Sequence, residues 1–198
     1  MWFASIWIFT LKLPWELGAD FFLRNLLDGD PASNTLSWRW VAGLQTHGKT
    51  YLARPSNIEK YTEGRFTAVK ELAPKASALQ GASLPRPIPV PPVARANIDL
   101  PSGLLVTEED CLPETLDLAG VTIKAVAGYV CTRYRSLLPV GDLPKAFAEG
   151  AVKDGVTRAG EAFNCPTAML QPGETGESFE HWIMAHGVQQ VLTAYPPV

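Results

Sequence analysis

Apolar side chains in the first third of the chain form runs of helical length that prolines, glycines and acidic turns separate. One apolar run covers residues 1–11 and is broken at Lys12, a second extends from 15 to about 27, and a third from 31 to about 43. We therefore predict three helices that form a helical layer. The first run is shorter than the ~20 residues of a membrane span. It also lacks the basic start of a signal peptide, so a buried helix is the better interpretation.

Short apolar runs alternate with amphipathic segments in the last half of the chain. Strands are predicted over residues 104–107, 122–129 and 188–194, and helices over 142–163 and 178–185. This alternation predicts a parallel sheet with covered faces, in a small Rossmann-like α/β domain. No glycine-rich phosphate-binding motif follows any of these strands.

The acidic residues Glu108, Glu109 and Asp110 follow the first predicted strand of that domain. They lie at the carboxyl end, where open sheets bind ligands. A polar turn that caps the strand explains the same three residues more simply.

The two patterns are separated by a proline-rich segment. Seven of the seventeen prolines lie between Pro74 and Pro101. Such a run donates few amides and stays extended, so it acts as a semi-rigid spacer or lies along a surface; an SH3-type ligand is the alternative. We predict a helical domain over 1–66, a linker over 67–103 and an α/β domain over 104–198. Residues 47–66 are expected to form an irregular wrap.

Composition and charge set limits on the function. The chain has 46% hydrophobic residues, enough for a core, and a formal net charge of -3. That mild acidity does not favour nucleic-acid binding. The first third nevertheless has a basic bias, which a solvated surface explains equally well. Five residues give it this bias: Arg39, Lys49, Arg54, Lys60 and Arg65.

The cysteines and histidines do not suggest a metal site. They lie far apart, without metal-ligand spacing, at Cys111, Cys131, Cys165, His47, His181 and His186. We expect reduced thiols in a cytoplasmic protein, with no metal and no membrane partner.

The segment 28–40 combines carboxylates, an amide and two indoles around one helix start. Asp30, followed by a proline, is typical of an N-cap. Asn34 and Trp38 are four residues apart and share a helix face, with Asp30 at its mouth, whereas Trp40 points elsewhere. This face suits a flat polar ligand. Core packing is the alternative for each tryptophan alone.

This segment resembles the flavin-binding part of the DNA photolyase and cryptochrome family. The resemblance covers about residues 1–60 and rests on Met-Trp-Phe-Ala-Ser at the start, Leu-Pro-Trp at 13–15, and Asp-Gly-Asp through Trp-Arg-Trp at 28–40. It implies that the fold is the C-terminal part of an FAD-binding domain. It further implies that Asn34 faces N5 of the flavin.

The resemblance also implies roles for the other residues of the motif. Asp28 and Asp30 would lie by the pyrimidine side of the flavin. Trp38 would be the flavin-proximal electron donor and Trp15 the second one, with a third tryptophan upstream of the chain. Two further residues, Met1 and Trp40, would line the cavity for a flipped-out pyrimidine dimer.

The implied function is light-driven repair of UV-damaged DNA by electron transfer from reduced FAD. Asn34 departs from the plant cryptochrome pattern and Met1 from that of the (6-4) photolyases, so a cyclobutane-dimer photolyase fits best. A cryptochrome-like light sensor and a non-catalytic FAD-binding relative are the alternatives. The family binds the FAD phosphates mainly upstream of Met1. We therefore expect a fragment cut at both ends, inactive alone.

Overall fold

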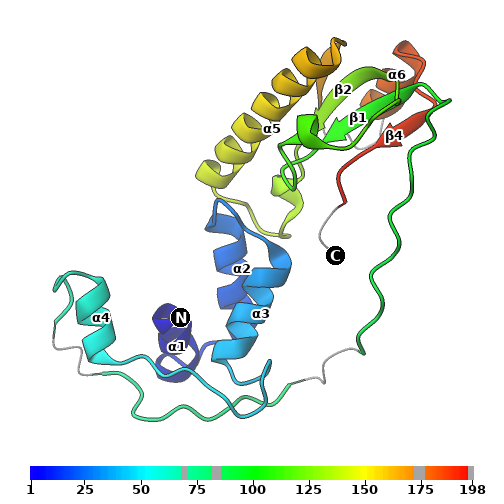
Figure 1. The fold of residues 1–198 in the computed structure, drawn as a ribbon. Coiled ribbons are helices and arrows are strands. Elements are labelled where there is room, and N and C mark those ends of the chain that lie inside the picture. The colour runs from blue at the N-terminus through cyan, green and yellow to red at the C-terminus, as the bar shows by residue number, and fades with distance from the viewer. Residues whose placement is uncertain (68–70, 82–85, 172–176, 196–198) are drawn as a thin grey trace. The chain divides into compact units, whose positions relative to one another are not determined.

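The computed structural model describes residues 1–67, 71–81, 86–171 and 177–195 and divides the chain into two compact units (Figure 1). Unit 1 is Met1–Ile88 and unit 2 is Pro89–Val198. Each unit has a hydrophobic core of its own. The helical unit precedes a parallel sheet with helices, so the predicted α plus α/β organisation is confirmed. Part of the predicted linker, 68–70 and 82–85, lies outside the described residues.

Unit 1 contains the three predicted helices and one more. Its elements are α1 (Trp2–Ser5), which continues as the π-helical segment Ile6–Thr10, then α2 (Trp15–Asn25), α3 (Pro31–Val41) and α4 (Pro55–Tyr61). The prediction of an irregular wrap over 47–66 was wrong for α4. This helix buries only Ile58, so the sequence has no periodic pattern of apolar residues that would predict it.

The start of α3 is set by its cap. The Asp30 carboxylate accepts a hydrogen bond from the backbone N–H of Ser33, and Pro31 occupies the first turn. The predicted N-cap is therefore confirmed. α3 packs against α2 at Gly18, where an added Cβ would lie 2.3 Å from Cη2 of Trp38. The glycine is thus required for the close approach of the Trp38 indole to α2.

Residues 71–81 lie along the helical unit and complete its core. The Ala73 backbone N–H donates to Oγ1 of Thr10 at 3.0 Å, and the Leu79 N–H donates to the Ala42 carbonyl at 3.0 Å. Ala73, Ala76 and Leu79 pack against the buried cluster that includes Trp38. The proline-rich segment was expected to act as a spacer or to lie along a surface, and residues 71–81 lie along a surface.

Unit 2 is a four-stranded sheet in the order β3-β2-β1-β4, with every pair parallel. The elements are β1 (Ser102–Val106), β2 (Ile123–Tyr129), α5 (Asp142–Phe163), β3 (Thr167–Leu170), α6 (Glu177–Ala185) and β4 (Gln190–Leu192), with 3-10 turns at Pro113–Thr115 and Thr132–Tyr134. β3 was not predicted, because only Leu170 of its four residues is buried.

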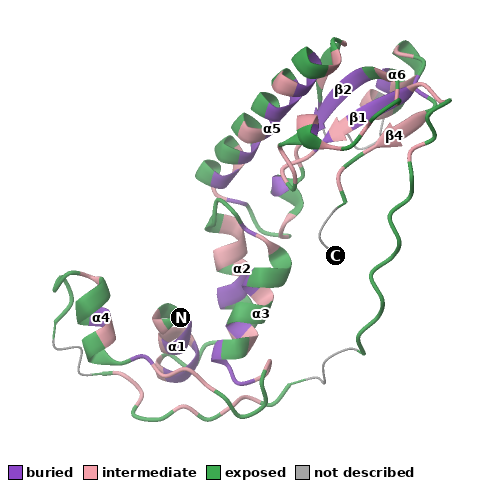
Figure 2. Cartoon of the chain, in the orientation of Figure 1, coloured by how far each residue is buried: buried purple, intermediate pink, exposed green. Residues whose placement is uncertain are grey.

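Alternate residues of the central strands bury the two faces of this sheet. Leu104 and Val126 pack with the buried stripe of α5 (Figure 2), whereas Ala125 and Ala127 pack with Trp182 of α6. An added Cβ on Gly103 would lie 2.3 Å from the Trp182 ring. The predicted sheet with covered faces is therefore confirmed.

The acidic turn after β1 has a structural role. Glu108 accepts hydrogen bonds from the Cys131 backbone N–H at 2.9 Å and from the Thr132 hydroxyl at 2.6 Å. Asp110 accepts one from the Leu112 backbone N–H at 2.9 Å. These contacts favour the simpler interpretation, a polar turn that ties the ends of two neighbouring strands together.

The described part of the chain contains no helix long and apolar enough to cross a bilayer. In the same ranges, no three His, Cys, Asp or Glu side chains are placed to hold a metal ion. The three cysteines form no disulfide. Burial raises the pKa of the Cys165 thiol, and burial together with the Asp110 and Glu108 carboxylates raises the pKa of Cys111, so both stay protonated at neutral pH.

Candidate cofactor site

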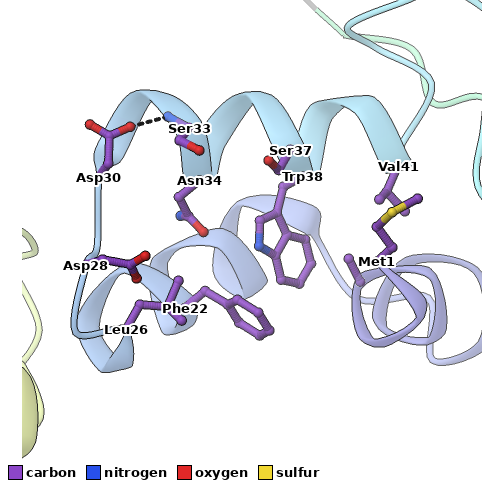
Figure 3. Close-up of a pocket in the computed structure, with 11 residues that line it drawn as sticks. Met1, Phe22, Leu26, Asp28, Asp30, Ser33, Asn34, Ser37, Trp38 and Val41 are labelled. Carbon is purple, nitrogen blue, oxygen red and sulfur yellow. Dashed lines mark hydrogen bonds between the residues drawn. The ribbon is translucent and has the colours of Figure 1, made fainter. Parts of the chain in front are cut away.

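A pocket of about 260 Å³ opens beside α1, α2 and α3 in unit 1 (Figure 3). It is lined by Met1, Ala4, Phe22, Leu26, Asp28, Asp30, Ser33, Asn34, Ser37, Trp38 and Val41. Five of the seven residues singled out from the sequence are therefore brought together. Its wall combines two carboxylates, an amide and two hydroxyls with the apolar edges of an indole and a phenyl ring.

Asn34 is held in one orientation at the pocket. Its side chain is 9% exposed, and Nδ2 donates to the Ala19 carbonyl of α2 at 2.8 Å. This bond assigns the nitrogen to the α2 side and leaves the amide oxygen as an acceptor for a ligand. The amide therefore belongs both to the contact between two helices and to the pocket wall.

Trp38 is buried in the core of unit 1 and lines the pocket. Its side chain is 3% exposed, and its ring makes edge contacts with Phe22 at 5.3 Å and Trp7 at 6.3 Å between centroids. Core packing and a place in the wall of a ligand pocket, the two interpretations made from the sequence, therefore both hold for Trp38. The core holds the indole rigidly at the edge of the pocket.

The two carboxylates lie at the turn between α2 and α3. Asp30 is engaged in capping α3, and Figure 3 shows Asp28 at the same end of the pocket as Asn34, across from it. Asp28 is exposed, so its carboxylate is accessible to a ligand. A carboxylate accepts hydrogen bonds only, so this end of the pocket favours a ligand with N–H donors.

Trp15 and Trp40 do not line the pocket. Trp15 packs at the rim of the same core, with the Arg39 guanidinium carbon 5.8 Å from its ring centroid. Trp40 is 37% exposed and faces Tyr51 at 6.3 Å between centroids. Of the two residues expected to line the lesion cavity, Met1 lines the described pocket and Trp40 does not. Electron transfer by Trp15 and lesion contact by Trp40 stay predictions.

The sequence interpretation missed several residues of the site. Ser33 and Ser37 lie four residues apart on α3, beside Asn34 and Trp38, so helical spacing alone could have placed them on the pocket face. No sequence signal could have placed Phe22 or Trp7 against Trp38, because these contacts depend on how the helices pack.

The pocket fits one end of a flat heteroaromatic cofactor. Acceptor groups lie at Asp28 and Asn34, and an apolar wall at Trp38 and Phe22. This set matches the isoalloxazine ring of a flavin, which has an imide N–H on one edge and a hydrocarbon edge opposite. The volume of about 260 Å³ is slightly below the range of about 300 to 1,000 Å³ for small-molecule sites, so the pocket has room for part of a dinucleotide and not for all of it.

The fold and the pocket together define a helical cofactor-binding unit joined to a small α/β unit. The family model described as the FAD binding domain of DNA photolyase matches residues 1–103. The chain belongs to this family, whose cofactor is FAD.

Comparison with curated proteins agrees with this assignment. The chain is 33% identical to a deoxyribodipyrimidine photo-lyase of Streptomyces griseus over 103 residues, which are 52% of this chain and 23% of that protein. A second such protein, from Agrobacterium fabrum, is 30% identical over 102 residues, 49% of this chain and 21% of the relative.

A cryptochrome DASH of Idiomarina loihiensis is 37% identical over 60 residues, 30% of this chain and 13% of that protein. The chain thus spans less than a quarter of the length of these relatives. No solved structure matches the chain significantly.

Proposed function

We propose that this chain is part of a light-driven, FAD-dependent photolyase that repairs pyrimidine dimers in UV-damaged DNA. The observation that carries the proposal is the single pocket that Asp28, Asn34 and Trp38 line together. The similarity to deoxyribodipyrimidine photo-lyases over the helical unit supports it.

The residues of the pocket have distinct tasks in this proposal. Bound FAD supplies light absorption and the electron that splits the dimer. Asp28 would accept a hydrogen bond from the imide N–H at the pyrimidine edge of the flavin. The amide of Asn34, whose Nδ2 donates to the Ala19 carbonyl, would direct its oxygen toward N5. Trp38 would exclude water from the ring and donate an electron when the oxidised flavin has to be reduced.

The proposed partner is DNA that contains a lesion. A damaged base pair costs less to extrude than an intact one, so an aromatic side chain at the surface can select lesions by stacking. Trp40 and Met1 are accessible for this contact, with 37% and 61% of their surface exposed. The five cations that give the first third its basic bias, from Arg39 to Arg65, would meet the phosphates.

The test is blue-light repair of a thymine-dimer oligonucleotide by the flavin-loaded protein that contains this chain. We expect restoration of intact thymines in the light and none in the dark. Bound flavin without repair would contradict the proposal and favour a cryptochrome-like sensor. The similarity to a cryptochrome DASH and the absence of Trp40 from the described pocket support that second candidate.

Replacing Trp40 with alanine is expected to weaken binding to dimer-containing DNA by about 1 to 3 kcal/mol, the usual contribution of one base-stacking aromatic. Binding of undamaged DNA should change little. The measurement is a titration of both oligonucleotides with each variant. Phe66→Ala is the matched control, because Phe66 is also an exposed aromatic of unit 1 but has no predicted contact with the lesion. Equal affinity of Trp40→Ala and wild type for the lesion would assign Trp40 to packing against Tyr51.

A further inference from the structure

Trp7 makes a direct ring contact with the proposed electron donor of the pocket. The Trp7 and Trp38 centroids are 6.3 Å apart, with an interplanar angle of 87°. The other described rings in contact with Trp38 are phenyl groups, Phe3 and Phe22. Trp7 is thus the tryptophan that meets Trp38 within the described part of the chain.

Trp7 also has a route for the proton that an oxidised indole releases. Its Nε1–H donates to the Pro14 carbonyl oxygen at 2.8 Å, and this hydrogen bond is exposed to solvent. Loss of an electron makes an indole N–H strongly acidic. A carbonyl acceptor at that hydrogen stabilises the positive charge, and adjacent water can take the proton.

Trp15 is in a less favourable position for the same task. Among the described residues it makes no ring contact with Trp38, and electron transfer slows steeply as the separation of two rings grows. The Arg39 guanidinium carbon lies 5.8 Å from its ring centroid. A fixed positive charge at that distance opposes the formation of a second one on the indole.

We propose that Trp7, and not Trp15 alone, supplies the electron that restores Trp38 after Trp38 has reduced the light-excited oxidised flavin. This inference rests on the proposed function. One electron passes from Trp38 to the flavin, and one from Trp7 to the Trp38 radical cation, which becomes neutral indole again. Trp7 then loses its Nε1 proton to water. A soluble thiol returns one electron, water returns the proton, and Trp7 is restored.

The experiment compares three variants of the flavin-loaded protein, Trp7→Phe, Trp15→Phe and Trp2→Phe, by transient absorption of the tryptophan radical. We expect Trp7→Phe to lower the yield of long-lived radical several-fold and Trp15→Phe to lower it less. Trp2→Phe is the matched control, since Trp2 lies in the same helical run and is half-buried, without a described ring contact to Trp38. FAD affinity and the thermal midpoint should stay at their wild-type values.

A second measurement locates the oxidised residue in the unmodified protein. After illumination in air without added thiol, peptide mass spectrometry should find oxygen addition at Trp7 in excess over Trp15. A wild-type radical yield in Trp7→Phe, or oxidation confined to Trp15, would overturn the inference. Repair of the thymine-dimer oligonucleotide tests the proposed function separately, so repair by a protein whose Trp7→Phe variant keeps the wild-type radical yield would remove this inference alone. Unimpaired photoreduction in Trp38→Phe would likewise remove Trp38 and Trp7 from the electron chain without deciding whether dimers are repaired.

Discussion

Replacing Trp38 with phenylalanine is expected to abolish most photoreduction of oxidised FAD while FAD remains bound. The indole at this position is 3% exposed and lies at the pocket edge, where electron donation to the flavin is most direct. Phenylalanine keeps an aromatic wall but is much harder to oxidise. The measurement is the loss of oxidised-flavin absorbance under blue light with a thiol present.

Trp182→Phe is the control for this experiment. Trp182 is equally buried, at 3% exposure, but belongs to the core of unit 2 and should leave photoreduction unchanged. Photoreduction at the wild-type rate in Trp38→Phe would show that Trp38 is a packing residue alone. FAD affinity is measured by equilibrium titration. An unchanged affinity would show that photoreduction is lost because the electron donor is missing, and not because FAD no longer binds.

Replacing Gly18 with alanine is expected to destabilise unit 1 by about 1 to 3 kcal/mol, the usual cost of overpacking a core. The added Cβ would lie 2.3 Å from Cη2 and 2.4 Å from Cζ3 of Trp38. The indole is buried among aromatic rings and cannot move aside without disturbing them. Urea unfolding followed by Trp fluorescence should give a lower midpoint with an unchanged slope.

Two comparisons make this prediction specific. Gly150→Ala in α5 adds a Cβ that meets nothing within 4 Å, so it should be neutral or stabilising by up to about 1 kcal/mol from helix propensity. Adding Trp38→Phe to Gly18→Ala should restore part of the loss, because phenylalanine lacks the two atoms that clash. Additive effects of the two substitutions would contradict the proposed steric conflict.

Local signals in the sequence predicted the parts of the structure that depend on neighbouring residues. Asp30 and the proline after it determine the start of α3, and spacing by four places Asn34 and Trp38 on one face of that helix. The pocket wall follows from that spacing. In unit 2, a short apolar run predicted β2 and amphipathic segments predicted both helices, because each of these elements buries a face.

Contacts between distant elements could not be predicted in this way. β3 is short and mostly exposed, so its place beside β2 comes from main-chain pairing and not from a hydrophobic pattern. The exposure of Trp40 and the contact of Trp7 with Trp38 depend on how α1, α2 and α3 cross. The sequence supplies the indoles, whereas tertiary packing decides which of them meet.

Residues 71–81 cover the core of unit 1 through Ala73 and Leu79. They therefore belong to the segment that has to be kept intact when unit 1 is joined to a different sequence. A gene fusion or recombination event that joined new sequence directly after α4 would remove the Ala73 N–H bond to the Thr10 hydroxyl, the Leu79 N–H bond to the Ala42 carbonyl, and part of the apolar cover of the core. Junctions within 86–95, where every residue is exposed, leave that cover in place. Selection on gene fusions should therefore favour breakpoints there, and the inherited unit is longer than its four helices.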